Sequence, residues 1–344
     1  MTVDTPATAP STDDQGSTVT RDDIERAADA LAPHMRRTPV IEVPGDEIGV
    51  DATIVLKLEY LQHSGSFKGR GATHFVATQP IAPDGIVAAS GGNHGAAVAW
   101  AARRFGHAAH IFVPTTATPA KVAKLRQFGA IVHEVGDVYG DALAASREYL
   151  TAHTATSIHA FDDPVVMAGA GTCARELDRD APGLDAVLLA CGGGGLAGGN
   201  AAWFGDRAET VAVETEGTAA WAAAKAAGSP APITVSGVAA DALGAAQTGA
   251  TPFRALPRVD ATSVVVTDDD VIGARLHLWN WLRVVVEPAA ATPIAALLTG
   301  AWRPTRPGGR IGVVLCGANT SLDALPATPF RSTDDPADQQ IVVL

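Results

Sequence analysis

Residues 185–199, DAVLLACGGGGLAGG, hold the pattern from which the fold can be inferred. The apolar run DAVLLA has the length and composition of a buried strand, and an Ala/Gly-rich helical segment follows the glycines at 196–203. Four glycines between a strand and a helix leave several backbone N–H groups free to point at one anion, and the helix dipole adds to that attraction. A tight turn would need fewer glycines. The stretch therefore predicts a phosphate site at the carboxyl end of a strand.

The same order of strand and helix recurs along most of the chain. Apolar strands are expected at 53–58, 85–90, 109–114, 130–135, 185–190, 209–214 and 310–316, with helices after most of them. Near-continuous apolar strands that alternate with helices are typical of parallel sheets covered on both faces. We therefore expect an α/β protein whose ligands bind at the carboxyl ends of the strands.

The composition excludes several classes of protein. The 344 residues carry 25 Lys and Arg against 37 Asp and Glu, a net charge of −12. An acidic chain is a poor match for nucleic acid or for an anionic membrane. The chain contains no apolar run long enough for a transmembrane helix and no signal-peptide pattern, and its three cysteines have no disulfide or metal-binding spacing. We expect a cytoplasmic protein with a small-molecule substrate.

Three further segments carry polar or reactive side chains. In SGSFKGRGA, residues 64–72, Lys68 is flanked by small residues, and Arg70 is a candidate cation that would lower the pKa of its amine and make it nucleophilic. SGGNHG, residues 90–95, and CGAN, residues 316–319, each follow an expected strand. Taken alone, Lys68 would be a surface-loop lysine, and the cysteine of CGAN would pack in the core, as free cysteines usually do.

A rival interpretation of the glycine run is a dinucleotide site. Gly193-x-Gly195-x-x-Gly198 satisfies the GxGxxG pattern, and Glu214 ends the next strand, where a ribose-binding acid is expected. One such pattern inside a run of glycines is a weak signal. An NAD(P)-dependent oxidoreductase is therefore the alternative from another enzyme class.

In combination, the motifs resemble those of a known family. SGSFKGRGA, SGGNHG, the tetraglycine loop, VVVEP at 284–288 and CGAN occur in the order found in fold-type II pyridoxal-phosphate enzymes. Over residues 20–325 the chain is similar to threonine and serine dehydratases and to serine racemase. The resemblance implies two three-layer α/β domains with mainly parallel sheets, the tryptophan synthase β-like fold. It also implies pyridoxal 5'-phosphate as the cofactor, with its phosphate on the tetraglycine loop.

The resemblance also implies roles for individual residues. Lys68 would carry the cofactor as a Schiff base and, once displaced by the amino acid, would take the Cα proton. Phe67 would lie against the cofactor ring, Asn93 would hydrogen-bond the ring hydroxyl, and Cys316 would face the ring nitrogen. The phosphate would bind the backbone N–H groups of Gly192, Gly193, Gly194, Gly195 and Leu196. The substrate carboxylate would bind Ser90, Gly91, Asn93 and His94.

Three departures from these relatives narrow the expected activity. Gly91 stands where the racemases have a serine, and because a glycine cannot move a proton, dehydration is favoured over racemisation. Ala220 stands where relatives have the second acid of a cation site, which leaves Glu214 and a backbone carbonyl for a monovalent or divalent cation. The chain ends about 25 residues after CGAN, so we expect no regulatory domain.

We therefore expect a pyridoxal-phosphate-dependent β-elimination, in which a small β-hydroxy amino acid such as L-threonine or L-serine is dehydrated and deaminated to a 2-oxo acid and ammonia. β-Replacement, or dehydration of a specialised β-hydroxy amino acid, stays open. The segments that would contact the substrate side chain, near 139–141 and 236–244, carry no recognisable motif.

The expected domain organisation is an insertion of one domain into another. A large, cofactor-binding domain would comprise residues 20–59 and 156–330, and a small domain would comprise residues 60–155. A disordered tail would precede them at 1–19 and a C-terminal tail would follow at 331–344. The resemblance alone implies a homodimer.

Overall fold

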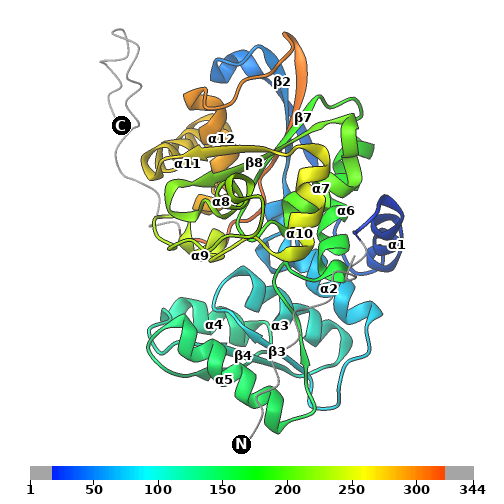
Figure 1. The fold of residues 1–344 in the computed structure, drawn as a ribbon, viewed down its shortest axis with the longest axis vertical. Helices are drawn as coiled ribbons and strands as arrows, with labels where there is room; N and C mark the ends of the chain where they lie inside the picture. The colour runs from blue at the N-terminus through cyan, green and yellow to red at the C-terminus, as the bar shows by residue number, and fades with distance from the viewer. Residues whose placement is uncertain (1–17, 322–344) are drawn as a thin grey trace, which may run out of the picture.

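The computed structural model describes residues 18–321 as two lobes, each built on its own sheet (Figure 1). The predictions for residues 1–17 and 322–344, which include the whole expected C-terminal tail, lie outside the described residues. Val19 is buried and packs into the core of the larger lobe. The expectation of disorder up to residue 19 is therefore wrong at Val19, because this apolar side chain joins the core.

The smaller lobe holds a four-stranded parallel sheet in the order β5-β4-β3-β6. Its strands are β3 (Ile86–Ala89), β4 (Ala109–Val113), β5 (Ile131–Glu134) and β6 (Thr156–Ser157), and its helices are α3 (Asn93–Phe105), α4 (Pro119–Gln127) and α5 (Tyr139–Ala152). The alanines of α3 pack against the sheet in one apolar core. Because β6 pairs with β3, this sheet extends beyond residue 155, the expected boundary of the small domain.

The larger lobe holds a six-stranded sheet in the order β1-β2-β10-β7-β8-β9. Its strands are β1 (Val40–Pro44), β2 (Ala52–Lys57), β7 (Ala186–Ala190), β8 (Glu209–Thr215), β9 (Thr262–Val266) and β10 (Gly309–Val314). All neighbours are parallel except β1, which returns antiparallel on β2. The expected α/β class with mainly parallel sheets is thus confirmed, although the outer strands β1 and β9 were not predicted.

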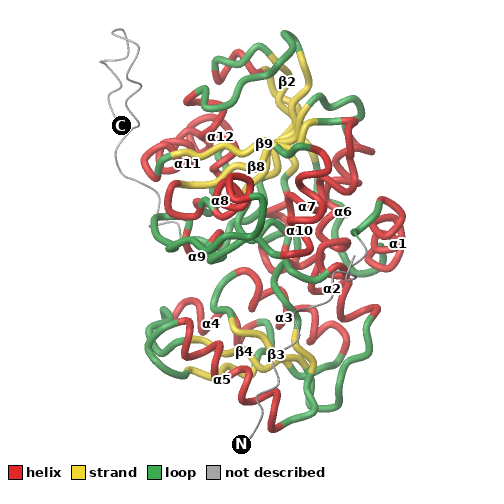
Figure 2. Tube along the Cα trace, in the orientation of Figure 1, coloured by secondary structure: helices red, strands yellow, loops and turns green. Residues whose placement is uncertain are grey.

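Helices cover both faces of the larger sheet, as Figure 2 shows. Outside the smaller lobe, the helices are α1 (Arg21–Leu31), α2 (Lys68–Thr78), α6 (Pro164–Asp180), α7 (Gly195–Phe204), α8 (Ala220–Ala227), α9 (Ala240–Leu243), α10 (Ala250–Ala255), α11 (Asp268–Leu282) and α12 (Pro288–Thr299). None of the helices in residues 18–321 is long and apolar enough to cross a membrane. The loops containing SGGNHG, the tetraglycine run and CGAN follow β3, β7 and β10, so all three lie at carboxyl ends of strands.

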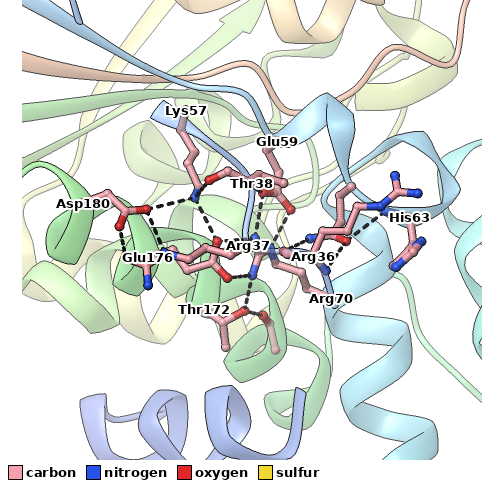
Figure 3. Close-up of polar contacts among 12 residues, drawn as sticks. Arg36, Arg37, Thr38, Lys57, Glu59, His63, Arg70, Thr172, Glu176 and Asp180 are labelled. Carbon is pink, nitrogen blue, oxygen red and sulfur yellow. Dashed lines mark hydrogen bonds and ion pairs between the residues drawn. The ribbon is translucent and has the colours of Figure 1, made fainter. Parts of the chain in front are cut away.

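Helix α2 lies between the lobes and packs against α3 of one and α6 of the other. Beside it lies a buried ion network, shown in Figure 3. The guanidinium of Arg70 donates to both oxygens of Glu59, at 2.6 and 2.9 Å, and to both oxygens of Glu176, at 2.8 Å each. Lys57 Nζ donates to Glu176 at 2.9 Å and to the carbonyl of Thr38 at 2.6 Å. Two cations therefore balance two carboxylates at the base of α2.

We expect the substitution Arg70→Met to lower the free energy of unfolding by about 3–5 kcal/mol, because it leaves the buried carboxylate of Glu59 without a cation and leaves Glu176 with Lys57 alone. Urea unfolding of the purified protein measures this. The matched control is Arg126→Met, which removes a 2.8 Å ion pair to Glu134 whose side chains are 59% and 40% exposed. That change should cost at most about 1 kcal/mol. Equal losses in the two variants would contradict a stabilising role for the buried network.

Candidate active site

The chain before Lys68 is held against the end of the last strand. Phe67 N donates to the carbonyl of Cys316 at 2.9 Å, and Ser66 forms an isolated antiparallel bridge with Gly317. These contacts bring SGSFKGRGA and CGAN together although they lie more than 200 residues apart. Lys68 is the first residue of α2 and therefore begins its helix directly beside the CGAN loop.

The side chain of Lys68 is directed into the protein. Its Nζ donates to the carbonyl of Ala160 at 2.7 Å and lies 5.1 and 5.7 Å from the ring centroids of Phe67 and Phe161. Burial lowers the pKa of the Lys68 amine to about 8, against the opposing influence of Cys316 and Glu287. An appreciable minority of the amine is therefore unprotonated near neutral pH, as a nucleophile or base requires.

The expected role of Arg70 as the cation that lowers this pKa is wrong. The Arg70 guanidinium is occupied by Glu59 and Glu176, and burial is the largest cause of the Lys68 shift. Lys68 and Arg70 lie two positions apart in α2, so their side chains point in different directions. Desolvation, rather than charge repulsion, thus activates the amine.

The tetraglycine loop forms a cradle of unpaired N–H groups. Gly194 precedes α7 with a φ of +93°, a left-handed conformation that favours glycine. Gly193, Gly194, Gly195 and Leu196 are buried. Within the described part of the chain, the backbone N–H groups of residues 192–196 meet no acceptor. Unpaired buried donors at a helix N-terminus are costly unless an anion binds them, so the loop fits a phosphate.

The surroundings of the loop support this fit. The hydroxyl of Thr248 is buried without a partner among the described residues, and its methyl group lies near Gly194. The ring of Phe161 packs so closely on Gly193 that a Cβ at that position would lie 2.4 Å from it. A small apolar cavity joins the loop to the amine; its lining residues are Phe67, Lys68, Gly71, Ala160, Phe161, Val166, Ala170 and Gly195.

The loop SGGNHG provides a second group of donors. Ser90 Oγ accepts a hydrogen bond from Gly92 N at 3.3 Å, and Asn93 begins α3. No acceptor for the backbone N–H groups of Asn93 and His94 is found in residues 18–321. The ring of His94 donates through Nε2 to the carbonyl of Ile158 at 2.9 Å, and burial lowers its pKa to about 3. The His94 ring is therefore neutral and already engaged, so only its backbone could bind a carboxylate.

Cys316 is the last residue for which the sequence predicts a role, and its carbonyl accepts from the N–H of Phe67, next to Lys68. Its side chain is buried, and burial raises the pKa of the thiol well above its usual value. It is therefore a neutral thiol, able to make only a weak contact with a ring nitrogen.

Glu214 is not brought to this site as a free ligand. Its two oxygens accept hydrogen bonds from Trp221 N at 2.6 Å and Ala222 N at 2.8 Å, so the carboxyl caps α8. Burial raises the pKa of Glu214 to about 8. The dinucleotide interpretation is wrong on this point, because both oxygens that would bind a ribose are occupied. The described residues contain no group of three metal-ligating side chains, and Glu214 in this state is a poor fit for a cation.

Four further residues of the site were given no role by the sequence analysis. Phe161, Thr248 and Asn319 lie in segments that sequence patterns do not single out as binding loops, except that Asn319 ends CGAN. Glu287, in VVVEP, accepts from Asn93 Nδ2 at 2.7 Å. Only the three-dimensional arrangement shows that these four side chains surround the predicted ones.

Comparison with known proteins gives a consistent result. The family described as "Pyridoxal-phosphate dependent enzyme" matches residues 31–317. The L-threonine ammonia-lyase of Geobacter sulfurreducens is 32% identical over 315 residues, covering 90% of this chain and 77% of that protein. The beta-hydroxyaspartate dehydratase of Paracoccus denitrificans is 32% identical over 321 residues, covering 89% and 98%. The phenylserine dehydratase of Ralstonia pickettii is 33% identical, covering 84% and 90%.

Solved structures show the same similarity. A threonine deaminase from T.th. superposes with a TM-score of 0.81 at 31% identity and covers 88% of this chain and 99% of that chain. Maize serine racemase superposes with a TM-score of 0.82 at 28% identity, covering 90% and 96%. With an amine in a shared cavity, a phosphate cradle and these relatives, the chain belongs to the family of pyridoxal-phosphate dependent enzymes.

Proposed function

We propose that this enzyme eliminates the β-hydroxyl group of a small β-hydroxy amino acid, with L-threonine and L-serine as first candidates, to give a 2-oxo acid and ammonia. The observation that carries the proposal is that Lys68 and Gly195 line one cavity. A single bound group can thus meet the amine at one end and the unpaired N–H groups at the other. Relatives named as threonine ammonia-lyase, hydroxyaspartate dehydratase and phenylserine dehydratase support the reaction class.

Lys68 has two tasks in this reaction. Lys68 and the tetraglycine loop would hold pyridoxal phosphate, which would supply an electron sink for the charge left when Cα loses its proton. The Lys68 amine would take that proton as a general base. Its pKa of about 8 suits the task, because an appreciable fraction of the amine is free to accept a proton near neutral pH.

The remaining residues orient the substrate and select the outcome. The backbone N–H groups at the start of α3, with Ser90 and Gly91, would hold the carboxylate, and Phe67 would lie against the ring. A neutral Cys316 cannot pair with a protonated ring nitrogen as a carboxylate would. With Cys316 as this partner, the ring would be a weaker electron sink, which would favour prompt loss of the β-hydroxyl over a long-lived charge at Cα.

We also propose a homodimer in a reducing compartment. The dimer follows from the resemblance to the dehydratases and racemases. The three cysteines Cys173, Cys191 and Cys316 are all free and buried, which suits a cytoplasmic protein. The cation considered for Glu214 has no support from the geometry of its carboxyl group.

The decisive experiment is the visible absorption spectrum of the purified protein before and after addition of L-threonine or L-serine. We expect a visible band that changes on addition, with release of a 2-oxo acid, and no band in Lys68→Ala. A band that ignores both amino acids would direct the search to β-hydroxyaspartate, to phenylserine or to β-replacement. No band after addition of pyridoxal phosphate would refute the proposal.

The phosphate cradle is tested by Gly194→Ala. At a φ of +93° a Cβ is strained, and it would lie 2.8 Å from Cβ of Pro252, so the loop must shift. We expect at least a tenfold weaker affinity of the cofactor-free protein for pyridoxal phosphate, measured by fluorescence titration. The control is Gly183→Ala, where φ is also left-handed, at +79°, but a Cβ meets nothing within 4 Å. Unchanged affinity in Gly194→Ala would exclude this loop as the phosphate site.

The preference for elimination over racemisation is tested at Gly91. A Cβ there meets only Val113 Cγ1, at 3.5 Å, so a serine fits without displacing the backbone. We expect Gly91→Ser to form D-serine from L-serine at a rate clearly above wild type, as measured by chiral chromatography. Gly91→Ala is the control, because it adds the same Cβ without a hydroxyl. Equal D-serine formation by both variants would show that the hydroxyl group has no role.

A further inference from the structure

Four polar side chains from both lobes meet at Asn93. Asn93 at the start of α3 and Lys124 in α4 belong to the smaller lobe, whereas Glu287 before α12 and Asn319 after β10 belong to the larger. Asn93 Nδ2 donates to Glu287 Oε1 at 2.7 Å, and Asn319 Nδ2 donates to Asn93 Oδ1. Lys124 Nζ donates to Asn319 Oδ1. Each of these three hydrogen bonds crosses from one lobe to the other.

The network determines which way the amide of Asn93 faces. An ionised carboxylate only accepts hydrogen bonds, so the NH2 group of Asn93 must be the end that points at Glu287. The oxygen then faces Asn319 Nδ2, whose own oxygen is held by Lys124. A primary amide has two N–H groups, and Glu287 takes one of them. The second N–H is the one available to the ring hydroxyl of the cofactor.

Glu287 and Lys124 depend on one another electrostatically. Glu287 is only 4% exposed, and burial raises its pKa to about 7, while Asn93, Asn319 N–H and Lys124 act in the opposite direction. Lys124 is partly buried, and its own pKa is lowered by burial but supported by Glu287. The other titratable or charged groups that act on or respond to Glu287 are Lys68, Asp241, Arg275 and Cys316.

We propose that Glu287 and Lys124 are positioning residues that orient the amide of Asn93 toward the cofactor and hold the two lobes together at that point. The inference deepens the proposed function, since it rests on Asn93 as the partner of the ring hydroxyl. Glu287 acts as the acceptor that fixes the amide. Lys124 acts through Asn319 and through its charge, which keeps Glu287 ionised.

The network responds to pH in a defined direction. When pH falls through about 7, Glu287 gains a proton, and its neutral carboxyl group accepts from Asn93 and Asn319 more weakly than the carboxylate does. The amide of Asn93 is then held less firmly in its orientation. The cofactor environment should therefore change on the acidic side of neutrality, and the midpoint of the change should follow the pKa of Glu287.

The test is a pH titration of the visible cofactor band, which does not depend on turnover, in Glu287→Gln and Lys124→Met. In wild type we expect an acidic transition near pH 7. Glu287→Gln should abolish it, because the amide does not titrate in this range. Lys124→Met should move it to higher pH, because Glu287 loses the neighbouring positive charge. Both variants should lower kcat at least tenfold with less than threefold change in KM, and Lys124→Arg should restore most of the loss.

Lys121 provides the matched control. It lies on the same helix and also crosses between the lobes, to Asp241 at 2.8 Å, but both side chains are exposed and neither contacts Asn319. Lys121→Met should keep kcat within twofold and leave the transition near its wild-type pH. A transition that stays in place in both Glu287→Gln and Lys124→Met would overturn the inference. Absence of a cofactor band in wild type would instead refute the proposed function, so the two failures can be told apart.

Discussion

The buried pairing of Arg70 with Glu59 and Glu176 is the constraint on which the site depends. Glu59 follows β2, Glu176 lies in α6, and Arg70 lies in the first turn of α2, so one guanidinium ties three elements together. Lys68 precedes Arg70 by two residues, and its backbone is positioned by the same first turn. A network of this kind contributes less through its own energy than through the single arrangement it allows, because every alternative leaves a buried charge unpaired.

Burial of the Lys68 side chain next to this first turn makes its amine reactive. The amine of Lys68 lies among Phe67, Phe161 and a backbone carbonyl, and that burial lowers its pKa. The tetraglycine loop favours a negative charge, because its buried N–H groups lack acceptors among the residues that the structure describes. One cavity thus has an amine poised to lose its charge at one end and a site that favours an anion at the other.

Local patterns were sufficient to predict the strand ends and their loops, but not the partners that distant segments supply. The tetraglycine loop and SGGNHG could be recognised because glycine content and strand–helix order are local properties. The partner of Arg70 could not be predicted, since Glu176 lies 106 residues away and nothing near Arg70 points to it. The role of Glu214 was predicted wrongly for a similar reason: its acceptors are filled by the first turn of α8, a contact that spacing along the chain does not reveal. The edge strands β1 and β9 lacked the fully buried runs that identified β7 and β8.

The division of the site between two lobes has a physical consequence for turnover. Near α2 the lobes share apolar contacts, since Val166 of α6 packs in the cluster of the smaller lobe, whereas the contacts around Asn93 that cross between the lobes are polar. Polar contacts exchange readily with water, so their net contribution is about 0.5–1.5 kcal/mol each, and somewhat more for charged groups. Opening the lobes at Asn93 therefore costs little compared with exposing an apolar core. A site closed by such contacts can exclude water while the proton is moved and still open to release the product.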